Sequence, residues 1–113
     1  MTDMATDLRT QLEGEFNEAM ERIYHDPIPL GYRAGRYIVG LRHAESGLAY
    51  AHHLLAAKPR KGLSRLQRMG RPDLSVEFLV LNPKYTFLFT DDERQVAWER
   101  LRLPVEAGSF SLG

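Results

Sequence analysis

Apolar side chains recur at intervals of three and four residues along most of the chain, the spacing that places them on one face of an α-helix. The pattern predicts helices over residues 6–25, 32–42 and 47–57. In the first of these the apolar positions are Leu8, Leu12, Phe16, Ala19, Met20 and Ile23. The segment 26–31 contains two prolines, which lack the N–H that a helix needs, so it is expected to separate the first two helices.

Glycines mark two further features of this pattern. Gly35 and Gly40 lower the helix propensity of the second segment and are interpreted as sites where another helix approaches closely. Residues 58–62 are predicted to be a loop, and residues 64–69 a short helix. Gly70 follows that helix and is expected to end it as the C′ residue, because glycine accepts a left-handed backbone.

The densest apolar block is 74–81, with the sequence LSVEFLVL. Its valine, leucine and phenylalanine would also suit a strand. Asp73 before it can serve as an N-cap, and the Asn-Pro pair after it is a typical helix stop. We therefore predict a short buried helix here.

The chain then continues through an apolar helical turn, 84–89, to a last helix, 91–102. Thr90 and Glu93 have the spacing of a capping box, in which each side chain accepts from the other residue's amide. The fold prediction is an all-α, single orthogonal bundle of five or six short helices around the central helix 74–81.

Length and composition bound the domain organisation. A chain of 113 residues is expected to form one domain, 1–103, with a loosely held tail, 104–113. No apolar run reaches 18 residues, no N-terminal signal pattern is present and there is no cysteine. A cytoplasmic location without membrane association is expected.

The zero net charge conceals a strong separation of charge. Residues 1–26 carry seven acids and two bases, residues 27–72 nine bases and one acid, and residues 73–113 seven acids and four bases. The candidate anion-binding or nucleic-acid-binding residues fall in the basic middle: Lys58, Arg60, Lys61, Arg65, Arg68 and Arg71.

Two interpretations of this basic segment stay open. A cluster of lysine and arginine suits a phosphate backbone. Alternatively, the same side chains pair with the acidic first and last helices or are simply solvated. Arg33, Arg36 and Arg42 would extend the cluster if the second helix lies beside it.

Five residues near the apolar block and in the last helix have predicted roles in capping, ion pairing or protein contact. Asp73 is expected to cap the helix 74–81, and Arg71 to pair with a carboxylate such as Asp73 or Glu77. Glu77 lies in the most apolar segment and needs a partner if it is buried. Tyr85 and Trp98 are the candidates for protein contact if their rings are exposed.

Catalytic and metal-binding patterns are not found. The histidines, His25, His43, His52 and His53, lack the spacing of metal ligands on one helix face. The serines have no G-x-S-x-G context, and the glycines at 31, 35 and 40 do not form a phosphate loop. We therefore expect no enzyme activity, no metal and no cofactor.

The chain from residue 31 to residue 102 resembles a small family of uncharacterised bacterial helical domains. The resemblance lies in GYRAGRYIVGL, GLAYAHHLL, GLSRLQRMGRPDLSVEFLVL and LFTDDE, with departures at Leu63, where an aromatic residue is usual, and Pro72, where leucine is usual. Such domains resemble accessory modules beside nuclease, restriction or mobile-element genes. The resemblance implies a nucleic-acid or defence setting and no particular chemistry.

The functional expectation is a non-catalytic binding module. It would contact nucleic acid, or a protein that processes nucleic acid, through the basic segment 58–71. The alternative is a protein–protein adaptor without nucleic-acid contact, including a homodimer through the acidic helix 6–25.

Overall fold

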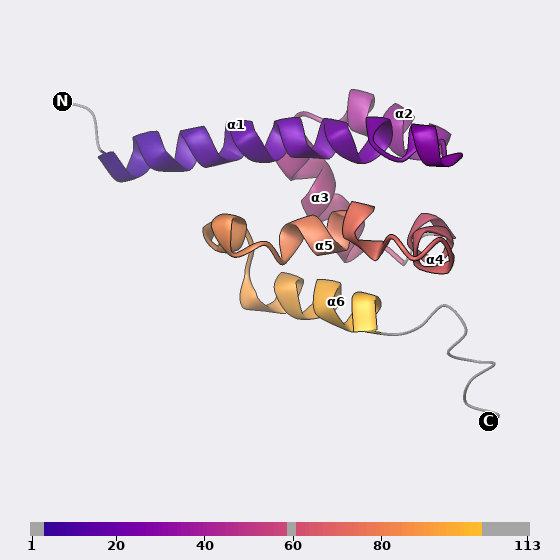
Figure 1. Ribbon diagram of the computed structural model, residues 1–113. Helices are drawn as coiled ribbons and strands as arrows, with labels where there is room; N and C mark the ends of the chain where they lie inside the picture. The colour runs from indigo at the N-terminus through magenta and orange to yellow at the C-terminus, as the bar shows by residue number, and fades with distance from the viewer. Residues whose placement is uncertain (1–3, 59–60, 103–113) are drawn as a thin grey trace.

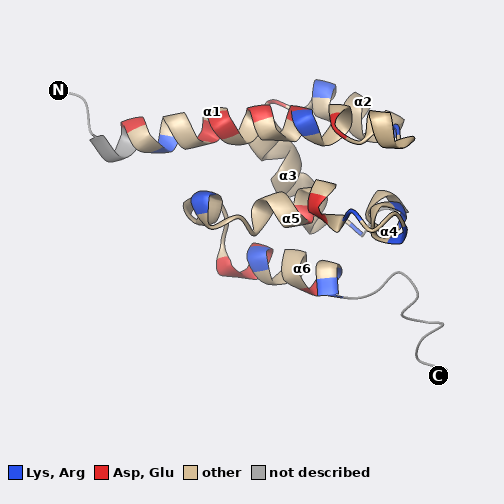
Figure 2. Cartoon of the chain, viewed as in Figure 1, with Lys and Arg blue, Asp and Glu red and all other residues tan. Residues whose placement is uncertain are grey.

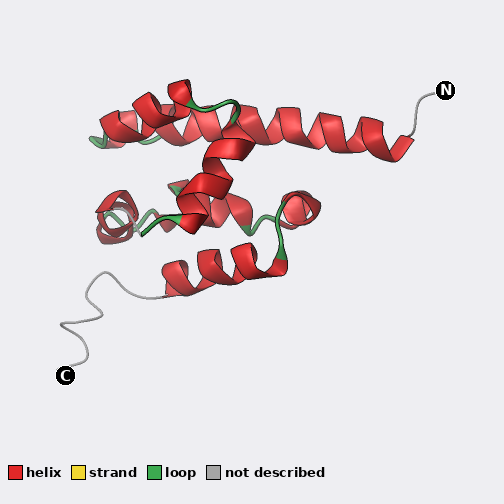
Figure 3. Cartoon of the chain, turned by 180° about the vertical axis from the view of Figure 1, so that it is seen from behind, coloured by secondary structure: helices red, strands yellow, loops and turns green. Residues whose placement is uncertain are grey.

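The computed structural model describes residues 4–58 and 61–102, and all regular structure within these ranges is helical (Figures 1 and 3). The all-α prediction is therefore confirmed. The elements in chain order are α1 (Met4–His25), η1 (Ile28–Leu30), α2 (Gly35–His43), α3 (Gly47–Ala56), α4 (Lys61–Arg68), η2 (Pro72–Leu74), α5 (Val76–Val80), η3 (Pro83–Leu88) and α6 (Asp91–Arg102), where η marks a 3₁₀-helix.

The long helix α1 lies on one side of the molecule, and α5 and α6 lie on the other (Figure 1). The helix α3 runs between these two layers and packs against both α1 and α6. Phe16 of α1 is fully buried; its ring centroid lies 5.1 Å from that of Tyr85 and 5.2 Å from that of Phe89. Burial of one such side chain contributes about 1.5–3 kcal/mol. The first helix thus packs on its own bundle.

A close crossing joins α1 to α3. A Cβ on Gly47 would lie 3.0 Å from the Cα of Asn17, so glycine lets the two backbones approach. The Asn17 Oδ1 accepts a hydrogen bond of 2.9 Å from the Leu48 amide. Gly40 is a second site of close approach, since its Cβ would meet the Tyr50 hydroxyl at 2.2 Å. The same prediction for Gly35 is wrong, because nothing lies within 4 Å of it.

Two local signals near helix ends are confirmed. Thr90 and Glu93 form the predicted capping box, with hydrogen bonds of 2.9 and 3.1 Å, and α6 has the predicted bounds. Gly70 has a φ of +75° and ends α4 as the C′ residue. Its amide donates to Gln67 and the Arg71 amide donates to Leu66, which is the Schellman pattern.

Several predicted helix starts differ from the structure, and α1 begins at Met4 and not at residue 6. The helix predicted over 32–42 begins only at Gly35, so residues 32–34 precede it as irregular chain. The helix predicted from residue 64 begins at Lys61, inside the segment predicted to be a loop. The tail 104–113 lies outside the described residues.

The prediction that Asp73 caps the central helix is wrong. The N-cap is Ser75, whose Oγ accepts from the Phe78 amide at 3.1 Å, and α5 spans only Val76–Val80. Pro72, with its fixed φ, instead begins the 3₁₀ turn η2 that contains Asp73. The Ser75 hydroxyl donates back to the Pro72 carbonyl at 2.7 Å and fixes this turn. Phe78 is 51% exposed, so one face of α5 meets solvent.

Candidate functional site

A half-open cavity of about 480 Å³ lies between the end of α1, the start of α2, α4 and α5. Its size falls within the range typical of small-ligand sites, about 300–1,000 Å³. The apolar part of its lining is Ile23, Ala34, Leu54, Leu63, Leu66 and Val76. Since these side chains come from five segments of the chain, the cavity exists only in the folded bundle.

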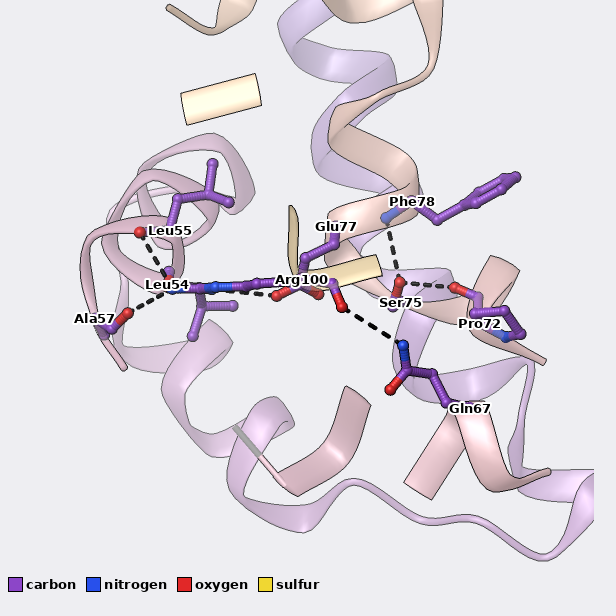
Figure 4. Close-up of polar contacts among 9 residues, drawn as sticks. All are labelled: Leu54, Leu55, Ala57, Gln67, Pro72, Ser75, Glu77, Phe78 and Arg100. Atoms are coloured by element: carbon purple, nitrogen blue, oxygen red, sulfur yellow. Dashed lines mark hydrogen bonds and ion pairs between the residues drawn. The ribbon is translucent and has the colours of Figure 1, made fainter. Parts of the chain in front are cut away.

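A buried ion pair lies at the wall of this cavity, between Arg100 of α6 and Glu77 of α5 (Figure 4). The side chains are 9% and 10% exposed, and Arg100 Nη1 lies 3.2 Å from Glu77 Oε2. The same guanidinium donates to the carbonyls of Leu54 at 3.0 Å, Leu55 at 3.3 Å and Ala57 at 2.5 Å. These carbonyls belong to the end of α3, where a helix lacks amides for its last carbonyls, although Leu54 also accepts from the Ala57 amide at 3.3 Å. Arg100 therefore caps α3 and neutralises Glu77.

Glu77 is the group in this pair that has capacity left for a ligand. Among the described residues, Arg100 is its hydrogen-bond donor, and it donates to Oε2. The carboxylate lines the cavity and is 8% exposed, so its Oε1 is an acceptor within a largely dry wall. The sequence predicted that Glu77 needs a partner, but Arg71, one of the partners considered, binds Asp73 instead.

Arginines surround the opening of the cavity. Arg33 and Arg36 line it from the start of α2, and both are exposed to solvent. Arg65 of α4 stacks on the ring of Tyr32, with its Cζ 5.4 Å from the ring centroid. This contact and the shared cavity place α4 beside the start of α2, so Arg33 and Arg36 lie near Arg65. Figure 2 shows the basic positions of α4 in blue.

The N-terminus of α2 adds a further positive feature at this edge. Its N-cap is Ala34, which has no side-chain acceptor, and no acidic residue occupies its first turn. Unsatisfied amides and the helix dipole favour negative charge at such an end.

Several other lysines and arginines are neutralised by the chain's own carboxylates. The ion pairs are Arg9–Glu13, Arg42–Glu21, Arg71–Asp73, Lys84–Glu15 and Arg100–Glu77. Hydrogen bonds from Arg71 hold the pKa of the Asp73 carboxyl below its ordinary value, and those from Arg42 do the same for the pKa of Glu21. Arg42 and Arg71 are thus occupied.

By contrast, Arg33, Arg36, Lys58, Arg65 and Arg68 are exposed and form no ion pair with any carboxylate in the part of the chain that the structure describes. We call Arg33, Arg36, Arg65 and Arg68 the arginine surface. Arg60 and the side chain of Lys61 lie outside the described residues. In the basic segment, Arg71 pairs with Asp73 of η2 and not with the acidic first or last helix, whereas Lys58, Arg65 and Arg68 face solvent, as both the binding surface and the solvated face predict.

The two aromatic candidates have different outcomes. Tyr85 is 4% exposed and packs against Phe16, so it belongs to the core and is not a surface anchor. Trp98 is 50% exposed, with the Arg102 guanidinium 5.1 Å from its ring centroid. Phe87, which was not a candidate, is 83% exposed.

The histidines do not gather into a metal site. Among the described residues, no group of three or more histidines and carboxylates could hold a metal ion. His52 instead contacts Glu93 through Nδ1 and packs on the ring of Phe89. No helix in residues 4–58 and 61–102 is long and apolar enough to cross a membrane.

Comparison with protein-family models, with curated proteins and with solved structures finds no match. The function is therefore inferred from the geometry of the cavity and of the arginine surface.

Proposed function

We propose that this protein is a non-catalytic module that binds nucleic acid through the arginine surface. The observation that supports this proposal is that some of the chain's cations form internal ion pairs and others do not. Carboxylates of the chain pair with Arg42, Arg71 and Lys84, whereas the arginines of the arginine surface face solvent without an ion pair among the described residues. Four guanidinium groups gathered from two segments suit a partner that carries regularly spaced negative charge.

The phosphates of a nucleic-acid backbone carry such regularly spaced negative charge. Arginine binds a phosphate through two parallel N–H groups, which a diffuse surface of lysines does not do. The resemblance of residues 31–102 to accessory modules beside nuclease genes supports the same setting. Lys58 lies exposed just before α4 and is a further cation available to the backbone.

The test is fluorescence anisotropy with labelled single-stranded and duplex DNA at several salt concentrations. With four phosphate contacts, the slope of log K against log salt is expected to be about −3. The double variant Arg65→Ala plus Arg68→Ala should weaken binding and reduce that slope by about 2. Binding that is absent at low salt, or unchanged in this variant, would refute the proposal.

A matched control removes the same charge elsewhere. Arg9 and Arg102 are exposed at other places, one paired with Glu13 and one stacked on Trp98. The double variant Arg9→Ala plus Arg102→Ala should bind DNA nearly as well as the unaltered protein. Equal losses in the two double variants would indicate a general charge effect and no defined surface.

A second candidate function is protein contact or homodimer formation through the outer face of α1. Leu8 is 56% exposed and Phe87 is 83% exposed. The Arg9 Nη1 donates to the Phe87 carbonyl at 3.2 Å, which places these two apolar side chains in the same region. Sedimentation equilibrium tests this function. A dimer that becomes monomeric in Phe87→Ser would support it, and a monomer at all concentrations would count against the homodimer.

A further inference from the structure

We infer that the cavity beside the arginine surface receives one nucleobase of a single-stranded nucleic acid, with a preference for bases that carry an exocyclic amino group. This inference rests on the proposed function and specifies its substrate. Three properties of the cavity carry the argument: its apolar walls, the arginines at its opening and the acceptor in its wall.

The apolar walls suit a flat ring. Leu63 and Leu66 from α4 and Val76 from α5 line the same space, so an inserted ring meets aliphatic side chains. The volume of about 480 Å³ exceeds what one ordered water needs and falls in the range of small-molecule sites. A base held in a duplex cannot enter such a cavity without leaving its stack, whereas an unpaired base can.

The arginines at the opening indicate which part of the occupant stays outside the cavity. Arg33 and Arg36 line the cavity and also reach solvent, so an anionic group of the occupant is stabilised at the opening and not in the interior. A nucleotide has this distribution of charge, because its base is uncharged and its phosphates flank the sugar. The exposed Arg65 on Tyr32 offers a place for the next phosphate along the strand.

The acceptor in the wall selects among bases. Glu77 is held in place by Arg100 through Oε2, at 3.2 Å, which leaves Oε1 to accept from the occupant. Adenine, cytosine and guanine present an amino group at their pairing edge, and carboxylates accept from such groups. Thymine and uracil carry no amino group there, and their single N3–H donor lies between two carbonyls, which a carboxylate repels. A site built to receive a donor rejects the analogue that lacks it.

The experiment measures anisotropy with labelled oligonucleotides of equal length: oligo-dC, oligo-dA, oligo-dT and a mixed duplex. Oligo-dC and oligo-dA are expected to bind about tenfold more tightly than oligo-dT, the size of one hydrogen bond to a charged group. The duplex is expected to bind more weakly than oligo-dC. Equal affinity for oligo-dC and oligo-dT would overturn the inference while leaving the proposed function intact.

Two variants locate the preference. Glu77→Gln keeps an acceptor for Arg100 and places an amide donor toward the cavity, so the preference for oligo-dC over oligo-dT should narrow or reverse. Leu63→Trp narrows the cavity from a half-buried position while leaving Glu77 and Arg100 unchanged, and should reduce or remove the preference. Val39→Trp is the control, because Val39 is 57% exposed and does not line the cavity.

The outcomes separate the two proposals. If no oligonucleotide binds, both the proposed function and this inference fail. If all oligonucleotides bind equally, or if Leu63→Trp keeps the preference of the unaltered protein, the nucleobase site fails alone. Circular dichroism checks folding, and should Glu77→Gln unfold, Leu63→Trp and the oligonucleotide series still decide the matter.

Discussion

Replacing Arg100 by leucine should destabilise the fold more than any change at an exposed arginine. In the structure this guanidinium donates hydrogen bonds to the carboxylate of Glu77 and to three backbone carbonyls, those of Leu54, Leu55 and Ala57. Leucine fills similar space but donates no hydrogen bond. The Glu77 carboxylate would stay buried without a counter-charge, and the end of α3 would lose its cap.

Removing one partner of a buried ion pair costs about 3–5 kcal/mol. A small domain has only about 5–15 kcal/mol of total stability, so this change takes a large share of it. With a urea m-value of about 1–3 kcal/mol/M, the unfolding midpoint should fall by more than about 1 M. Far-UV circular dichroism follows the helices during the titration, and Trp98 fluorescence serves as a second probe.

Two comparison variants make the result interpretable. Arg71→Leu removes a guanidinium from an ion pair whose side chains are 44% and 42% exposed, and the midpoint should hardly change. The double variant Arg100→Leu plus Glu77→Leu should be more stable than Arg100→Leu alone, because no buried charge remains unpaired. Similar midpoints for Arg100→Leu and Arg71→Leu would refute the assignment of Arg100 as a cap and counter-charge.

The remaining predictions concern substitutions of two glycines and the stability of the fold at low pH. Gly40→Ala should lower stability by about 1–3 kcal/mol in a urea titration, because the new methyl group meets a tyrosine ring of α3 at 2.2–2.8 Å. Gly35→Ala, in open space at the start of the same helix, should instead raise stability by about 0.5–1 kcal/mol, and a loss there would contradict the packing described. Burial raises the pKa of Glu93, but the Thr90 amide and His52 together lower it more, so this pKa lies below its ordinary value of 4.5. The carboxylate therefore stabilises the fold above that value, the contribution is lost as the pH falls through the lowered pKa, and Glu93→Gln should flatten the acid side of the stability profile.

Features set by neighbouring residues could be predicted from the sequence. The capping box needs only the three-residue spacing of Thr90 and Glu93, and the end of α4 needs only a glycine after the last apolar turn. Both follow from local backbone geometry, so no knowledge of the packing is required. The same holds for the all-α fold, since apolar periodicity alone indicates which face of each helix is buried.

Features that join distant residues could not be predicted. Glu77 and Arg100 are 23 residues apart, and nothing in the sequence distinguishes Arg100 from the other arginines of α6. The error at Asp73 has a local cause: Asp73 and Ser75 are both good caps, and the turn set by Pro72 decides between them. The cavity likewise depends on how α4 lies beside the start of α2, which periodicity does not give.

The structure also explains how a chain with zero net charge keeps an arginine surface. Three acids of α1 pair with cations outside the arginine surface: Glu13 with Arg9, Glu21 with Arg42 and Glu15 with Lys84. Among the described residues, no ion pair joins α1 to the arginine surface. Charges farther apart than about 8 Å are largely screened at physiological salt, so the net charge of the whole chain does not set the field near one surface. Under the proposed function, a polyanion would meet the local charge of the arginine surface, which the isoelectric point of about 6.9, an average over the whole chain, does not describe.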